Sequence, residues 1–191
     1  MRNRAPRADH RSVRLRRPDS ANLFCLGLTT VMYAAAWEAL GDSVYWLMLS
    51  AATIPACFGA LCIVMYRHGA RDDPQGLRKS YALVFAASIL ALPFGLPVLT
   101  SHTGGITVLG TGFLVLGLRE RSWQVCAAGV LAAAVGIVAA QAATNNYSAS
   151  DAVFGIWSAP ISVACLGIAI LVGGTLTYVQ ETRKFVSAVG L

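Results

Sequence analysis

Few side chains in the apolar parts of this chain carry groups that could bind a ligand or move a proton. Glu38 is the one formal charge inside a long apolar stretch, and Gln141 lies near the end of another. His102 follows Ser101 in a short polar break, but adjacency in sequence does not indicate a nucleophile beside its base. A carboxylate, an amide and an imidazole could together bind a polar ligand if the fold brings them to one depth.

Two prolines interrupt the apolar stretch 81–100. Pro93 and Pro97 have no N–H group, so the carbonyls of Ile89 and Pro93 lose their usual helical partners. In lipid such a carbonyl must be satisfied by a side chain, a water or a neighbouring helix. Two interpretations follow: a simple proline kink packed against other helices, or a discontinuous helix that lines a polar cavity.

No catalytic or metal-binding motif is present in the sequence. The patterns HExxH, GxSxG and the P-loop are missing, and no pair of carboxylates lies inside an apolar stretch. The cysteines form no CxxC and no Cys/His metal spacing, so we interpret them as small packing residues. They are Cys25, Cys57, Cys62, Cys126 and Cys165. We therefore expect no metal, no cofactor and no enzyme activity.

The elements that must position these residues are membrane helices. Charged residues make up 13% of the chain, whereas soluble domains have about 25%. A helix of about 20 apolar residues crosses a bilayer core. We predict an all-α polytopic membrane protein, a six-transmembrane-helix bundle of three helical hairpins, between a disordered basic arm at 1–20 and a tail at 180–191. The predicted helices cover 21–40, 44–66, 81–100, 101–118, 123–144 and 152–179.

The basic residues predict the orientation of this bundle. All 15 lie outside the predicted helices, in the arm, in 67–80, in 119–122 and in the tail. The alternate loops at 41–43, 101–105 and 145–151 have none. By the positive-inside rule both termini are then cytoplasmic, in a plasma (inner) membrane. The Arg, Ala and Gly content favours a bacterial source.

A cleaved signal peptide is the alternative interpretation of the N-terminal region. A basic segment, an apolar run and the small residues Ala34, Ala35 and Ala36 form a cleavage-like pattern. Cleavage after residue 36 would leave five helices in the same orientation, so the charge pattern does not decide between the two. The basic segment is long for a signal peptide and the apolar run is a full span, which favours retention.

The arm at 1–20 holds seven arginines and almost no large apolar residue. Next to a membrane these charges attract anionic lipid headgroups. We therefore expect the partners to be the bilayer and its anionic headgroups, with a pure topology signal as the alternative. Nucleic acid is not expected, because no aromatic residue is interleaved for base stacking.

A stripe of small residues indicates close helix packing on the predicted helix 123–144. It consists of Gly129, Ala133, Gly136 and Ala140, spaced so that they lie along one side of a helix. Such a stripe lets two backbones approach closely. It predicts packing within the same bundle or, alternatively, a dimer face.

The predicted topology places one group of polar and proline residues in the outer half of the bundle. They are Glu38, Pro93, Pro97, His102 and Gln141. They form a candidate outer-half polar site. Alternatively, they are interfacial residues whose polar groups are in contact with water. The near absence of buried charge favours a non-catalytic accessory, sensor or assembly subunit, acting through helix contacts with a membrane protein partner or a second copy. The clustered prolines favour the alternative, a small transporter or channel.

Overall fold

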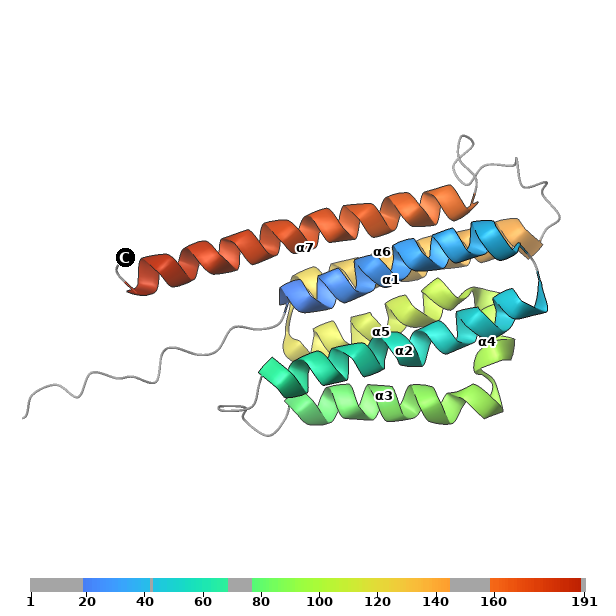
Figure 1. Ribbon diagram of the computed structural model, residues 1–191, viewed down its shortest axis with the longest axis horizontal. Coiled ribbons are helices and arrows are strands. Elements are labelled where there is room, and N and C mark those ends of the chain that lie inside the picture. The colour runs from blue at the N-terminus through green and yellow to red at the C-terminus, as the bar shows by residue number, and fades with distance from the viewer. Residues whose placement is uncertain (1–18, 42, 69–76, 145–158, 190–191) are drawn as a thin grey trace, which may run out of the picture.

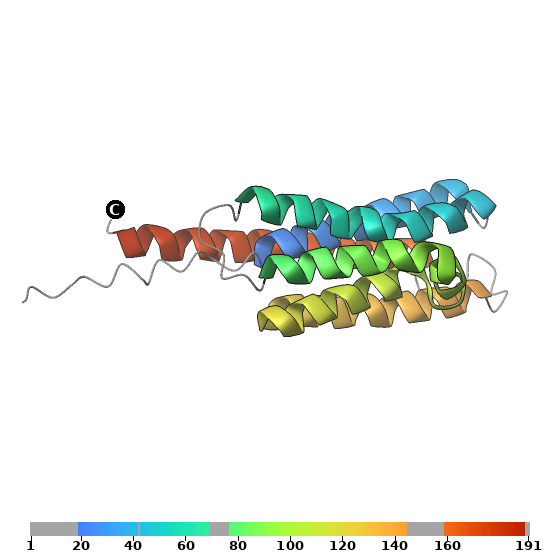
Figure 2. The same cartoon turned by 90° about the horizontal axis from the view of Figure 1, so that it is seen from below.

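The computed structural model describes residues 19–41, 43–68, 77–144 and 159–189, and all of these lie in helices or short connections between them. The predicted all-α class is confirmed over these residues, which contain no strand. The helices are α1 (Asp19–Leu40), α2 (Val44–His68), α3 (Leu77–Phe94), α4 (Leu96–Thr103), α5 (Gly105–Glu120), α6 (Trp123–Thr144) and α7 (Ala159–Val189). Six of them lie alongside one another, and the short α4 turns across one end (Figures 1 and 2).

Among the described residues, four helices are long and apolar enough to cross a membrane. They are α1, α2, α6 and α7, and the pair α3 and α4 makes a fifth if the bent pair counts as one span. The prediction of a helical membrane protein is thus confirmed at this level. The sixth span would be α5, which has 16 residues, so the six-span count stays a prediction.

The apolar stretch 81–100 is divided between two helices instead of forming the single predicted one. The axis bends by 91° between the segments Lys79–Pro93 and Leu96–Thr103. Gly95 separates α3 from α4, and Pro97 falls in the first turn of α4, where its missing N–H costs nothing. The two prolines therefore end one helix and begin another.

Other helix limits also differ from the predicted ones. The helix predicted at 101–118 begins at Gly105, after Gly104 adopts a positive φ of 79°, which favours glycine. The residues predicted as a tail from 180 onward continue α7 to Val189. Residues 1–18 of the predicted arm and 152–158 of the last predicted helix lie outside the described residues.

The helices do not pair as the three consecutive hairpins of the prediction. The two most extensive contacts join α5 with α6 and α1 with α7, and α2 pairs with α3. The first helix therefore packs more on the last than on its neighbour in sequence. Figure 1 shows α1 lying between these two helices, α7 and α2. Helix α5 contacts α1, α2, α3, α4 and α6, which is more helices than any other described helix contacts.

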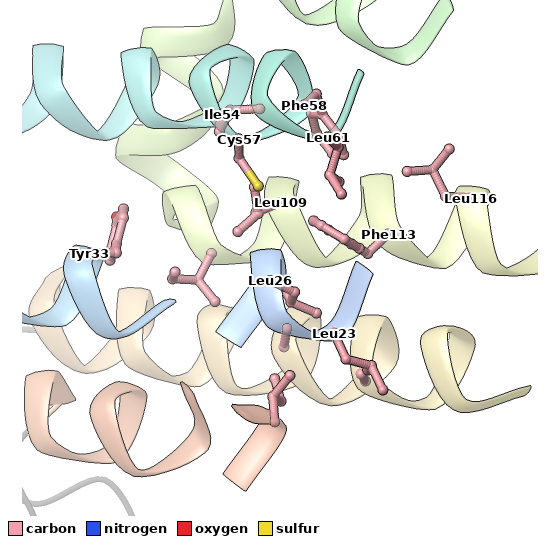
Figure 3. Packing of buried hydrophobic residues seen from close by; sticks show 14 of the residues in the cluster. Leu23, Leu26, Tyr33, Ile54, Cys57, Phe58, Leu61, Leu109, Phe113 and Leu116 are labelled. Atoms are coloured by element: carbon pink, nitrogen blue, oxygen red, sulfur yellow. The ribbon is translucent and has the colours of Figure 1, made fainter. Parts of the chain in front are cut away.

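The apolar core lies where α1, α2 and α5 face one another (Figure 3). Leu26, Leu61, Phe113 and Leu116 are almost fully buried there. Phe58 and Phe113 are in contact, with ring centroids 5.5 Å apart. The core thus gathers on the inner faces of the helices, while many large apolar side chains point outward.

The small-residue stripe on α6 lies against α5 of the same chain. A Cβ atom added to Gly129 would lie 2.6 Å from the backbone N of Leu114, and one added to Gly136 would lie 2.5 Å from that of Thr107. Ala133 lies next to Gly110 of α5, and Ala140 lies next to Gly104, directly before α5. Only small residues allow this backbone-to-backbone approach.

A second close approach, which the sequence analysis did not identify, joins α1 and α7. A Cβ added to Gly27 would lie 3.0 Å from the carbonyl oxygen of Gly167. A Cβ added to Gly167 would meet Val31 at 2.7 Å. These contacts bring the first and the last helix together although 140 residues separate the two glycines.

Candidate functional site

One end of the bundle carries the basic residues, and we call it the basic end. Hydrogen bonds join the starts of α1 and α3 to the end of α5, so these helix ends lie together. The described basic side chains at this end are exposed; they are Arg67, Lys79, Arg119, Arg121 and Arg183. In Figure 1 this is the end at which α2 finishes and α3 starts.

Three polar side chains from three helices meet at the basic end, and we call them the polar clasp. They are Asn22 of α1, Tyr81 of α3 and Glu120 of α5, which are 0%, 2% and 5% exposed. The amide Nδ2 of Asn22 donates to Tyr81 Oη at 2.8 Å and to Glu120 Oε2 at 2.9 Å. Tyr81 Oη donates to Glu120 Oε1. Each hydrogen of the amide and the phenol therefore has an acceptor within the clasp.

The turn between α5 and α6 holds Glu120 inward. Arg121 adopts the left-handed conformation with φ 56°, which is uncommon for a residue other than glycine, and its N–H bonds back to Leu118. The N–H of Ser122 bonds to the carbonyl of Gly117. This compact turn ends α5 with Glu120 buried, while the flanking Arg119 and Arg121 are exposed.

Further polar pairs attach α7 to the same end. The hydroxyl of Ser20 on α1 donates to Glu181 Oε2 at 3.1 Å. The hydroxyl of Thr177 donates to Gln124 Oε1 on α6 at 3.0 Å. Polar contacts at the basic end thus connect α1, α3, α5, α6 and α7.

The chemistry open to the polar clasp follows from its two donors and one carboxylate. An ionised Glu120 accepts from both Asn22 and Tyr81, so fixed donors face the charge of a side chain that is buried among the helices. Losing either donor would remove one of the hydrogen bonds that stabilise this buried carboxylate. No group of three His, Cys, Asp or Glu side chains that could hold a metal exists among the described residues. The clasp is therefore suited to joining helices or to holding a proton.

The residues of the predicted outer-half site lie at the opposite end. Glu38, Pro93, His102 and Gln141 are exposed there, on α1, α3, α4 and α6, and Pro97 is half-buried. The exposed members of this group do not converge on a buried cluster comparable to the polar clasp. Whether they bind a ligand stays a prediction.

An aromatic cluster fills the space between α1 and α2 at this opposite end. Tyr33 meets Trp46 edge to face with centroids 4.5 Å apart, and Trp37 stacks on Trp46 at 5.8 Å. The hydroxyl of Tyr33 accepts a hydrogen bond from the N–H of Gly105 at 3.2 Å. The cluster therefore ties the first hairpin to the start of α5.

The polar clasp was not predicted from the sequence, because Asn22, Tyr81 and Glu120 lie at or beside the limits of three separate predicted helices. One signal was present: Glu120 is the single acidic residue in the segment 119–122, between two arginines. That signal does not identify the partners of the carboxylate, which lie 39 and 98 residues away in sequence.

Comparisons of the chain with protein-family models, with curated proteins and with solved structures find no significant match. The class of protein is thus defined by the fold alone. Its described part is an all-helical bundle with four to five helices of membrane-spanning character.

Proposed function

We propose that this chain is a non-catalytic subunit of a plasma membrane, an accessory, sensor or assembly protein that acts through contacts between its helices. The observation that carries the proposal is that its buried polar side chains bond to one another between helices. Asn22, Tyr81 and Glu120 bond to one another across three helices, and Thr177 bonds to Gln124 across two. These groups hold helices together, and none of them is arranged as a nucleophile with its base.

The proposed topology has six spans and both termini in the cytoplasm. It is supported by the position of the basic residues, since every Lys and Arg in the described helices lies toward the basic end. Cytoplasmic loops carry such an excess. The 16 residues of α5 reach about 24 Å, which is less than the bilayer core of about 30 Å. We propose that α4 and Gly104 complete this span at the opposite end.

The proposed environment of the bundle is lipid, with anionic headgroups at the basic end. Large apolar side chains are exposed on several helices, which would be unfavourable in water. They include Leu28, Met32, Leu83, Leu90, Leu131 and Ile168. Exposed Arg67, Lys79 and Arg183 could meet headgroups at the cytoplasmic surface.

A transport assay tests the proposed role directly. The protein would be reconstituted in liposomes that contain a pH-sensitive dye, and proton or salt gradients would be applied. We expect the same leak as in liposomes without protein. A protein-dependent flux that the Glu120→Gln exchange or the Pro93→Ala exchange abolishes would contradict the role as an accessory, sensor or assembly subunit.

A small transporter or channel with an outer-half site is the second candidate function. It is favoured by the 91° break between α3 and α4, because broken helices line substrate sites in many transporters. The break falls on Pro93 and Pro97, at the end where Glu38, His102 and Gln141 are exposed. A flux that depends on these residues would support this candidate.

A further inference from the structure

Two of the five cysteines face each other across α1 and α2. Cys25 Sγ lies 3.4 Å from Cys57 Sγ and 3.7 Å from the carbonyl oxygen of Cys57. Both are free thiols. Figure 3 shows the Cys57 side chain at the centre of the core, between α2 and the neighbouring helices. We propose that Cys25 and Cys57 form a dithiol–disulfide site that exchanges electrons with a lipid-soluble quinone.

The geometry of the pair suits a reversible disulfide. A disulfide has an S–S distance of about 2.05 Å, so the two sulfurs need to approach by about 1.4 Å, which side-chain rotation and a small helix shift can provide. The other cysteines have no such partner among the described residues. Cys62 and Cys126 are half-buried on α2 and α6, and Cys165 is exposed on α7.

The depth of the pair selects the kind of oxidant. Cys25 lies six residues from the start of α1, about 9 Å along the helix, and Cys57 lies eleven residues from the end of α2, about 16 Å. In the proposed topology both thiols are then inside the hydrocarbon region. A charged, water-borne disulfide such as oxidised glutathione would have to leave its hydration shell to reach them.

A quinone balances the reaction without leaving charge in the membrane. Two S–H bonds break and one S–S bond forms, and the two electrons and two protons convert the two carbonyl groups of the quinone into the hydroxyls of a hydroquinone. Both the reactants and the products are neutral, so no ion has to be desolvated as a net product. Cys25 is half-buried whereas Cys57 is 4% exposed, which makes Cys25 the sulfur that the quinone approaches.

The disulfide would join α1 and α2 covalently. In the reduced protein α1 packs more extensively on α7 than on α2, so oxidation would add a constraint to the weaker of these two contacts. The redox state of the membrane quinone pool would thus determine whether α1 and α2 are linked by a disulfide. The existence of the site does not depend on the proposed accessory role.

The test uses a variant that retains only this pair, Cys62→Ser/Cys126→Ser/Cys165→Ser, in liposomes with a fully substituted benzoquinone. The ring carbons of such a quinone carry no hydrogen, so it does not form a lasting thioether. After incubation the protein is denatured and alkylated with N-ethylmaleimide, and its mass is measured by mass spectrometry. We expect loss of both alkylation sites, a peptide that links Cys25 to Cys57, and one hydroquinone formed per protein. Two alkylated thiols after quinone treatment would overturn the proposal.

Three controls make the result specific. Cys25→Ser and Cys57→Ser, each in the same background, should form no internal disulfide and no hydroquinone; hydroquinone formed equally by either would overturn the proposal. Oxidised glutathione outside the vesicles should leave the pair reduced, and equally fast oxidation by it would overturn the choice of quinone. Peptide mapping of the unsubstituted protein repeats the test if the triple variant folds poorly.

Discussion

At the scale of single residues, the polar clasp shows how a membrane bundle uses a carboxylate near its surface. Asn22 and Tyr81 bury their donors against Glu120, and none of the three is more than 5% exposed. Interhelical hydrogen bonds in membranes contribute modestly, about 0.6 kcal/mol on average and about 1.7 at most, because the separated helices find other partners. The clasp matters most through the cost of leaving one of its groups unpaired.

Removing the phenol hydroxyl should therefore cost measurable stability. Tyr81→Phe keeps the ring but removes the hydroxyl that bonds to both Glu120 and Asn22, so we expect the protein to lose about 1 kcal/mol and its melting temperature in detergent to fall. Ser20→Ala is the matched control, because its bond to Glu181 is only partly buried. A Tyr81→Phe protein that melts like the unsubstituted one would contradict this role of the clasp.

Substitutions at Glu120 distinguish the effect of its charge on stability from the effect of its size and hydrogen bonds. Glu120→Gln retains both side-chain length and one acceptor, whereas Glu120→Ala removes the carboxylate that accepts from Asn22 and Tyr81, which then keep only their bonds to each other. We expect the alanine variant to melt at a lower temperature than the glutamine variant. The reverse order would mean that the buried charge itself destabilises the bundle.

At this scale the sequence could predict the small residues but not their polar neighbours. Gly129 and Gly136 repeat at helical spacing, so their packing role is visible in one segment. Asn22, Tyr81 and Glu120 come from three segments, and nothing local marks them as partners. Cys25 and Cys57 were predicted to be packing residues for the same reason, because their proximity arises only when α1 and α2 fold together.

At the scale of helices, the contact of α5 with α6 depends on glycine. Gly129→Ala would place a Cβ 2.6 Å from the backbone N of Leu114, and a backbone atom can yield only if the helices separate. Overpacking of this kind costs about 1–3 kcal/mol. We expect a lower melting temperature and a lower yield of monodisperse protein.

The control for this exchange is on α7. Gly173 has no atom within 4 Å of the position of its missing Cβ, so Gly173→Ala should leave stability unchanged or raise it by up to about 1 kcal/mol through better helix propensity. Equal melting of the two alanine variants would show that the α5–α6 contact tolerates separation.

The break between α3 and α4 was partly predictable from the sequence. Pro93 and Pro97 indicate an interruption, and a discontinuous helix was one of the two interpretations. The bend of 91° could not be predicted, because it depends on where Leu96 and Thr100 find buried positions in the bundle. Proline removes hydrogen bonds but does not choose the direction in which the chain continues.

A distance measurement checks this bend. Spin labels at Leu83 and Ser101, which are both exposed, would be about 27 Å apart along a straight helix. The bend should bring the two labelled backbones clearly closer. Labels at Leu131 and Gln141 on the unbroken α6 provide the reference for label geometry. A distance that matches a straight helix would contradict the division into α3 and α4.

At the scale of the whole molecule, the charge pattern predicted which helix ends meet, whereas the hairpin order could not be predicted. Placing all basic segments on one side requires α1, α3 and α6 to start there, and this is the arrangement in Figure 1. The pairing of α1 with α7 arises from Gly27 and Gly167, and no charge rule contains that information. The placement of charges therefore predicts the direction in which each helix runs, but it does not predict which helices pack against each other.

The orientation itself can be tested with a membrane-impermeant maleimide. In a cysteine-free background, Ser43→Cys and Ser101→Cys place a thiol at the end of the bundle opposite the basic end, and Gln180→Cys places one on α7 near the basic end. With both termini cytoplasmic, intact cells should label the first two positions and not the third, because lipid and the positive-inside distribution hold the basic end inside. Permeabilised cells should label all three, which shows that Gln180→Cys is reactive. Labelling of Gln180→Cys in intact cells, or equal protection of Ser43→Cys and Ser101→Cys, would contradict the proposed topology and with it the cytoplasmic position of the polar clasp.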